Sequence, residues 1–72
     1  MVYRIEDAGS QQYEITDIVL NKKGDRGESI VVTFPANAPE EAMRLAVQGL
    51  LNKTYRRSVR SFVMTKKVGD HD

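Results

Sequence analysis

The clearest change in the hydrophobic periodicity of the chain lies at the boundary that spans residues 34–42. Before this boundary, Ile30, Val32 and Phe34 alternate with mostly polar neighbours, the pattern of a strand with one dominant buried face. Pro35 ends that strand, because proline has no N–H group to donate to a neighbouring strand. A helix-start pattern follows at once. The chain therefore combines strands with a helix, and the order of these segments restricts the folds that it can adopt.

Two helix starts are compatible with the residues at the boundary. Asn37, with Glu40 three residues later, fits a capping box. Alternatively, Ala38 is the cap and Pro39 occupies the first helical position, since a residue before proline avoids the helical region. Apolar residues then recur at helical spacing, which predicts the face that packs on the sheet. The main row of this face is Ala42, Leu45, Ala46, Gly49 and Leu50, the flanking row is Met43, Val47 and Leu51, and the solvent side is marked by Arg44 and Gln48.

Extended segments and turns precede the boundary. Residues 2–6 are expected to form a short first strand at an edge of the sheet, and residues 8–12 are expected to form a turn. The polar loop of residues 21–28 contains two glycines. It connects the strand before it to the strand of residues 30–34, which predicts a hairpin.

The strand before that loop changes the parity of its apolar residues. Tyr13 and Ile15 point to one side of a regular strand, whereas Ile18 and Leu20 point to the other. A bulge or a bend at Asp17 would return both pairs to the core side. We therefore predict an irregular backbone at Asp17.

The last strand lies in the β-rich segment of residues 59–68. A right-handed helical crossover places it beside the second predicted strand and antiparallel to it. We therefore predict an α+β fold of two layers in the order β-β-β-α-β. It has one mostly antiparallel sheet of three to four strands, with one helix packed on a face. Residues 1–68 are expected to form this single domain, and residues 69–72 a disordered C-terminal tail.

Length and composition limit how the fold is stabilised. A chain of 72 residues buries only about 60% of the surface that its unfolded form exposes, so its core is thin. It has no cysteine and therefore no disulfide, which leaves apolar packing or self-association into a homo-oligomer to hold the fold. We find no signal peptide and no apolar run long enough to cross a membrane. We expect a small soluble cytoplasmic domain.

Charge is distributed unevenly along the chain. Residues 1–41 contain four basic and eight acidic residues, whereas residues 42–69 contain seven basic residues and no acidic one. Such asymmetry can mark a surface for an anionic partner. Arginine offers a planar donor array that suits phosphate, and tyrosine can stack on a base. The predicted nucleic-acid-binding residues are Lys53, Tyr55, Arg56, Arg57, Arg60, Lys66 and Lys67, with Lys22, Lys23 and Arg26 as an auxiliary basic loop.

A structural interpretation of the basic segment stands beside the functional one. In a regular strand Arg56 and Arg60 would share one side and Arg57 would take the other, so the three form one patch only if the segment is irregular. Basic residues on an edge strand also prevent aggregation between sheets.

No group of residues predicts catalysis, a cofactor or a metal site. His71 lies between Asp70 and Asp72 in the expected tail, where nothing would hold a metal ligand or a general base rigidly. Glu40 and Glu41 open the predicted helix, where its exposed N–H groups favour acidic residues. We therefore predict that the protein is not an enzyme and has no catalytic residue, cofactor or metal.

The order strand, strand, helix, strand resembles the layout of the small archaeal ribosomal proteins of the LX type. The resemblance covers the last two-thirds of the chain, with Glu40–Ala42 opening the helix and the basic Tyr55–Ser58 entering the last strand. It implies binding to ribosomal RNA.

Two function classes follow. The leading hypothesis is a non-enzymatic binding module that engages a polyanion, RNA or DNA phosphates above all, through the basic second half of the chain. The alternative is a small protein-interaction module, such as a regulator, an inhibitor or an assembly subunit, that binds through a sheet edge or a helix face. The expected partner is thus nucleic acid or a protein, and not a membrane. Apolar residues on both sides of the predicted sheet motivate the alternative: Val31, Phe62, Val63 and Met64.

Overall fold

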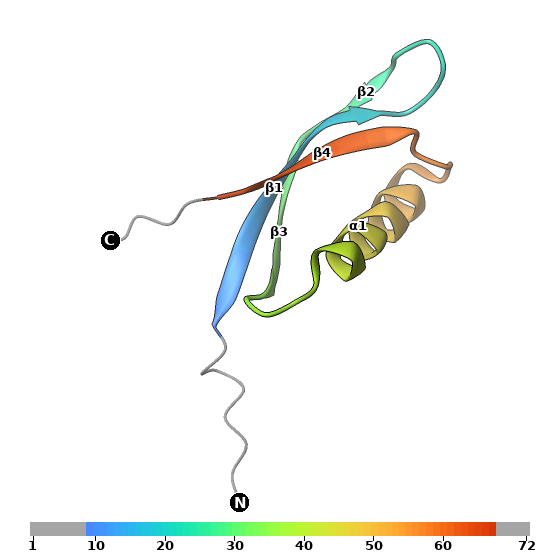
Figure 1. The fold of residues 1–72 in the computed structure, drawn as a ribbon. Coiled ribbons are helices and arrows are strands. Elements are labelled where there is room, and N and C mark those ends of the chain that lie inside the picture. The colour runs from blue at the N-terminus through green and yellow to red at the C-terminus, as the bar shows by residue number, and fades with distance from the viewer. Residues whose placement is uncertain (1–8, 68–72) are drawn as a thin grey trace, which may run out of the picture.

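The described part of the chain, residues 9–67, folds into one sheet with one helix in the order β-β-β-α-β, as Figure 1 shows. The computed structural model describes residues 9–67, so the predicted strand 2–6 and the predicted tail 69–72 with His71 lie outside the described residues. The predicted α+β class and element order are confirmed, with a two-residue strand in the loop as the third strand before the helix. The elements are β1 (Ser10–Val19), β2 (Arg26–Gly27), β3 (Ile30–Pro35), α1 (Glu40–Tyr55) and β4 (Ser61–Lys66).

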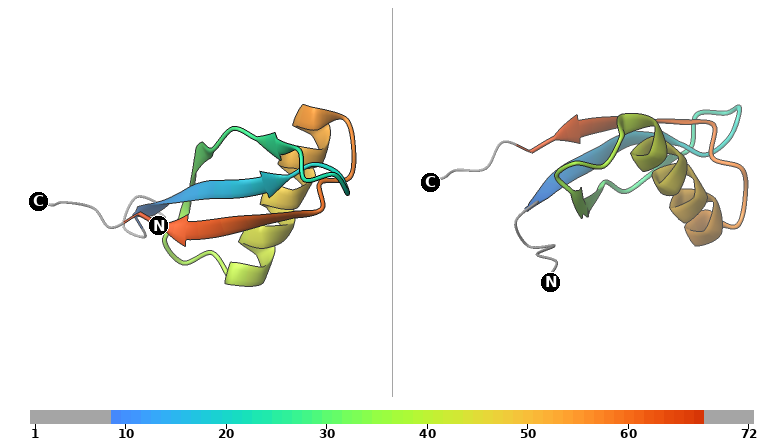
Figure 2. Two further views of the ribbon diagram at one scale, coloured as in Figure 1. Left: turned by 90° about the horizontal axis from the view of Figure 1, so that it is seen from above. Right: turned by 60° about the horizontal axis from the view of Figure 1, so that its bottom comes forward.

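Strand β1 lies in the centre of the sheet and pairs with every other strand, always antiparallel. Tyr13 pairs with Val32 of β3 and with Lys66 of β4. Near the other end of β1, Val19 pairs with residues of β2 and β4. Strands β2 and β3 therefore share one side of β1, and β4 occupies the other (Figure 2). This confirms the predicted place of the last strand beside the strand that contains Tyr13.

The predicted irregularity at Asp17 is confirmed. Asp17 has a positive φ of 50°, and the register between β1 and β4 shifts between Thr16 and Val19. Because of this bulge, Ile15 and Ile18 both face the helix and are fully buried. They form the centre of the core.

The predicted turn over residues 8–12 is wrong for its described part. Ser10, Gln11 and Gln12 belong to β1 and pair with β3. Their polar side chains favour a turn locally, but the ladder to β3 decides the conformation, because strand formation depends on cross-strand partners more than on intrinsic propensity. A positive φ of 70° occurs at Gly9, whose carbonyl oxygen accepts a hydrogen bond from the Ala36 amide at 3.1 Å.

Both predicted helix caps are wrong by one or two residues. The N-cap is Pro39, which makes no side-chain capping bond, and α1 begins at Glu40. The Ala38 amide donates to the Pro35 carbonyl at 3.0 Å, so the residues between them form a separate turn. The Pro39 carbonyl then accepts from the Met43 amide at 3.1 Å and starts the helical ladder.

The helix packs on the sheet with the row that we predicted to be only its flank. Met43, Val47 and Leu51 are buried, and Val47 and Leu51 belong to the same core cluster as Ile15 and Ile18. This row carries larger side chains than the alanine- and glycine-rich row beside it, so it removes more apolar area from water. Within residues 9–67, no helix is both long and apolar enough to cross a lipid bilayer.

The predicted main row of α1 instead lies outside the core. Leu45 is 69% exposed and Leu50 is 44% exposed. Ala42, Ala46 and Gly49 between and beside them are also exposed. The predicted solvent side is wrong as well for Gln48, which is half-buried, whereas Arg44 is exposed as expected.

Candidate nucleic-acid interface

The loop between β1 and β2 and the connection between α1 and β4 lie at the same end of the molecule (Figure 1). The Arg60 amide donates a hydrogen bond to the Val19 carbonyl at 2.9 Å. The Tyr55 phenol lies against Gly27 of β2. These contacts bring together basic residues that are more than thirty positions apart in the sequence. We call this surface the basic end, and it consists of Lys22, Lys23, Arg26, Lys53, Arg56, Arg57 and Arg60.

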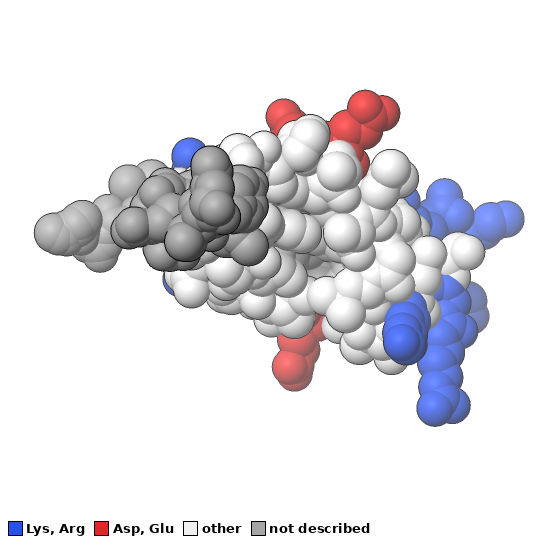
Figure 3. Space-filling view, turned by 90° about the horizontal axis from the view of Figure 1, so that it is seen from below, with Lys and Arg blue, Asp and Glu red and all other residues white. Residues whose placement is uncertain are grey.

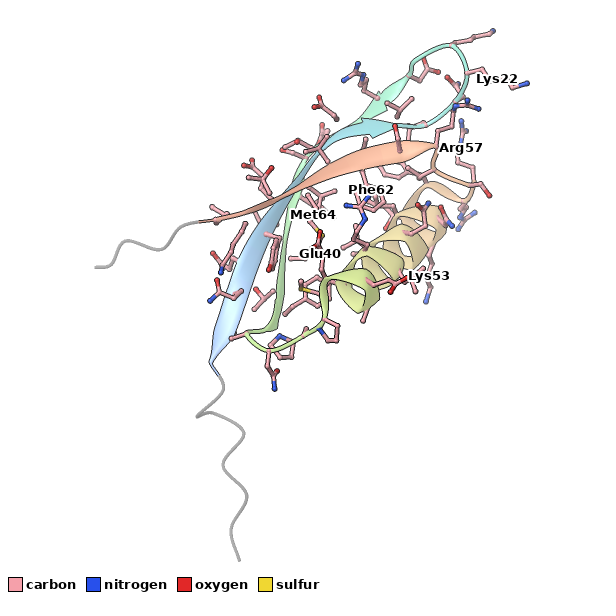
Figure 4. All side chains as sticks on the ribbon, in the orientation of Figure 1. Lys22, Glu40, Lys53, Arg57, Phe62 and Met64 are labelled. Atoms are coloured by element: carbon pink, nitrogen blue, oxygen red, sulfur yellow. The ribbon has the colours of Figure 1, made fainter. Side chains whose placement is uncertain are left out.

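All cations of the basic end are exposed. Figure 3 shows basic side chains gathered at this end of the molecule, and Figure 4 labels Lys22 on the loop between β1 and β2, Arg57 on the connection after α1 and Lys53 on α1. Arg26 is bound by Asp17, with 3.0 Å between the guanidinium Nη1 and the carboxylate Oδ1. Within residues 9–67, no other cation of the basic end forms an ion pair. Six positive charges therefore remain available to a partner from that part of the chain.

Asn21 orders the loop that carries Lys22 and Lys23. Its Oδ1 accepts hydrogen bonds from the Lys23 amide at 3.0 Å and the Asp25 amide at 3.2 Å. Its Nδ2 donates to the Asp25 carboxylate at 2.8 Å, which holds that side chain against Asn21. Gly24 supplies the positive φ of 89° that the turn requires. The two lysines are thus presented from a closed turn.

Helix α1 ends at Arg56 in the left-handed conformation, with φ 58° and ψ 41°. The amides of Arg56 and Arg57 both donate to the Asn52 carbonyl, the latter at 3.2 Å. Glycine is the usual residue at such a helix end, because a Cβ atom disfavours the left-handed region. The basic segment is therefore a helix end followed by an irregular connection, and the alternating strand geometry for its arginines does not occur.

A side-chain clamp fixes that connection to the helix at Val59. The Asn52 Oδ1 atom accepts from the Val59 amide at 2.8 Å and from Gln48 Nε2 at 2.9 Å. Gln48 Nε2 also donates to the Val59 carbonyl at 2.9 Å. Both backbone polar groups of the buried Val59 are thereby satisfied, as burial requires. The clamp also fixes the backbone that leads into Arg60.

Two groups of predicted site residues have other surroundings. Tyr55 is half-buried, packs against the core and contacts Gly27, so its ring has a packing role. Lys66 pairs with Tyr13, and the Lys67 amide donates to the Gln12 carbonyl at 2.8 Å. Lys66 is thus the last residue of β4 and Lys67 follows it, about 16 Å or more from the first residue of the strand at 3.3 Å per residue. The structure does not bring them to the basic end.

Sequence reasoning missed Arg44 as a candidate site residue. Its guanidinium carbon lies 5.2 Å from the centroid of the Phe62 ring, in a cation–π contact. Arg44, Arg60 and Phe62 also line a hollow of about 270 Å³ between α1 and the start of β4. No local sequence signal places Arg44 there, because the contact depends on which side of α1 faces β4.

In residues 9–67, no three His, Asp or Glu side chains come together as a metal site would require. The predicted absence of a role for His71 concerns residues outside the described range.

Comparison with known proteins gives no match to any family model, curated protein or solved structure. The resemblance to ribosomal proteins of the LX type thus rests only on the residues given for it above.

Proposed function

We propose that the chain is a non-enzymatic module that binds the phosphates of RNA or DNA through its basic end. The observation that carries this proposal is the convergence of two distant loops on one exposed surface. Six of its cations, all except Arg26, have no acidic partner among residues 9–67. Arginine and lysine side chains arranged in this way suit the sequence-independent contacts by which proteins neutralise phosphates.

The distribution of acids supports the same proposal. Glu14 lies in the middle of β1, in register with Val31 and Thr65, and not at the basic end. The acids of the first turn of α1 lie at the opposite end of the helix from Lys53. Glu14, Glu40 and Glu41, three of the six acids in the described first half, are therefore separated from the basic end. Asp17, Asp25 and Glu28 lie in or beside its loop, so folding preserves part of the charge asymmetry of the sequence.

Fluorescence anisotropy of labelled single-stranded RNA, duplex RNA and duplex DNA tests the proposal. Each phosphate contact contributes about −0.7 to the slope of log affinity against log salt for single strands. Six contacts therefore give a slope of about −4, and affinity falls about 300-fold between about 50 and 200 mM salt. No binding to any of these nucleic acids at the lowest salt would overturn the proposal.

Two double variants with equal charge distinguish the basic end from net charge. Lys22→Gln/Arg57→Gln removes one cation from each loop of the basic end, whereas Lys66→Gln/Lys67→Gln removes two cations at the other end of β4. We expect the first pair to weaken binding and to reduce the slope by about 1.4. The second pair should leave the slope nearly unchanged. Equal effects of both pairs would show that net charge, and not this surface, governs binding.

The outward face of α1 favours a second candidate function, a protein-interaction module that associates with a second copy of the chain. Leu45 and Leu50 are 69% and 44% exposed, and the alanines and glycine around them leave this face without charge between Glu41 and Lys53. Because α1 is acidic in its first turn and basic in its last, two antiparallel helices would place opposite charges together. The opposite face of the sheet offers less, since its exposed valines are separated by β1: Val31 pairs with Glu14 and Val63 with Thr16.

Sedimentation velocity over a range of protein concentrations tests this second candidate. We expect a concentration-dependent dimer that Leu50→Glu abolishes, because a charge would be buried in the apolar contact. Val31→Glu is the matched control on the outward sheet face and should leave the dimer intact. A monomer at every concentration would exclude self-association through α1.

A further inference from the structure

The hollow between α1 and β4 combines charge with an apolar wall. Its volume of about 270 Å³ is close to the lower end of the range of about 300–1,000 Å³ for ligand pockets, which suits a single small group. It opens beside the basic end, because Arg60 belongs to both. The residues that line it are Arg44, Leu45, Gln48, Arg60, Ser61 and Phe62.

The walls of this hollow are held in place by hydrogen bonds within the chain. Gln48 and Asn52 of α1 bind both backbone groups of Val59 at 2.8 to 2.9 Å. The next residue, Arg60, is fixed to β1 through its amide and the Val19 carbonyl at 2.9 Å. The distance between the helix wall and the strand wall is thus set before any ligand arrives, which lowers the entropic cost of binding.

One side of the hollow is suited to a flat ring. Arg44 rests on Phe62 at 5.2 Å from the ring centroid, yet its own side chain is exposed. Nucleobases stack on arginine planes and on aromatic side chains. Leu45, which is 69% exposed, adds an apolar edge that has no partner within residues 9–67. A base could therefore lie against this side.

The other side of the hollow is suited to a phosphate. Arg60 is exposed and carries a guanidinium group that can bind two phosphate oxygens. Ser61, the next residue, also lines this wall. A single nucleotide matches the two sides of the hollow, because it joins a flat base to an anionic phosphate.

We propose that the hollow holds one unpaired nucleotide of a single-stranded nucleic acid. The base lies against Leu45 and the Arg44 guanidinium, and its phosphate is bound by Arg60. This inference rests on the proposed function and names the preferred polyanion, because the bases of a duplex are stacked on each other and cannot enter. The basic end then holds the neighbouring phosphates of the same strand.

Anisotropy titrations with a single-stranded oligonucleotide, as RNA and as DNA, and with a duplex of equal length test the inference. Leu45→Ser removes the apolar edge without changing charge, and Leu50→Ser is its matched control, an exposed leucine of α1 that does not line the hollow. We expect Leu45→Ser to weaken single-strand binding at least about five-fold. Duplex binding should change less than about two-fold, and Leu50→Ser should have no effect on either.

A second pair of variants tests the stacked arginine. Arg44→Gln should weaken single-strand binding more than Lys66→Gln, which removes the same charge far from the hollow. Circular dichroism confirms that each variant is folded. Equal binding of single strands and duplex, unchanged by Leu45→Ser and Arg44→Gln, would overturn the inference and leave the proposed function standing. Absence of binding to all nucleic acids would overturn both the inference and the proposed function. Binding of poly-glutamate that depends on Leu45 would show that the hollow does not select a nucleotide.

Discussion

Replacing Arg56 by glycine separates backbone strain from charge at the basic end. Arg56 has φ 58° and ψ 41°, a conformation that costs a residue with a Cβ atom about 1–2 kcal/mol. Glycine relieves this cost, but its greater freedom in the unfolded chain offsets about 0.4–1 kcal/mol. We therefore expect Arg56→Gly to stabilise the fold by about 0.5–1 kcal/mol, which raises the melting temperature of a domain of this size by about 2–8 °C.

The matched control is Arg56→Ala, which removes the same charge and keeps the Cβ atom. Urea unfolding followed by circular dichroism should give Arg56→Ala a free energy of unfolding within about 0.5 kcal/mol of the original chain. Both variants should weaken nucleic-acid binding equally and reduce the salt slope by about 0.7. Arg56→Gly should therefore be more stable than the original chain and Arg56→Ala equally stable, although both have the same binding defect.

The outcome that would refute this reasoning is equal stability of the two variants. It would mean that residue 56 does not occupy the left-handed region in solution. The helix would then end with a different backbone conformation at this residue. Different binding by two equally charged variants would instead show that Arg56 acts on the shape of the basic end and not through its charge.

Three further predictions concern the packing that holds the basic end. Gly27→Ala places a methyl group into the Tyr55 phenol and should cost about 1–3 kcal/mol in urea unfolding, a cost that disappears in a Tyr55→Leu background. Asn52→Ala leaves the Val59 amide without its acceptor; we expect a loss of about 1–3 kcal/mol and faster hydrogen exchange at that amide. Ile18→Ala should cost about 2–5 kcal/mol, and a loss below about 1 kcal/mol would contradict its burial by the bulge.

The parts of the fold that follow from pattern and chirality could be predicted from the sequence. The change of parity between Ile15 and Ile18 predicts a bulge or a bend, and the structure has a bulge at Asp17. The place of β4 beside β1 follows from the handedness of a helical crossover. Neither prediction depends on the details of side-chain packing.

The face of α1 could not be predicted, because two adjacent rows of the helix are both apolar. Periodicity gives equal support to the row of Leu45 and to the row of Val47, and only the competition for the sheet decides between them. The cap at Pro39 was missed for a related reason, since the turn between Pro35 and Ala38 sets where the helix can start.

The types of residue in the candidate site could be predicted from the sequence, but not which of the basic residues lie together in the structure. Adjacency in the sequence grouped Lys66 and Lys67 with the arginines, although a full strand separates them. The link between the loop of Lys22 and the connection of Arg57 depends on the pairing of β1 with β4, which is a long-range contact. Electrostatic patches of this kind are properties of the topology and cannot be read from charge runs alone.

The central position of β1 has a consequence for how the chain reaches its folded state. Its partners on one side, β2 and β3, are the next strands in the sequence, but its partner on the other side is distant: Val19 pairs with Ser61, and Tyr13 with Lys66. Contacts over such separations slow folding, because a long loop must close before they form. During synthesis, one edge of β1 therefore stays open until the last strand emerges. A chain interrupted before β4 would expose that edge to strands of other copies, so translation to the end of β4 is the step that protects the sheet from aggregation.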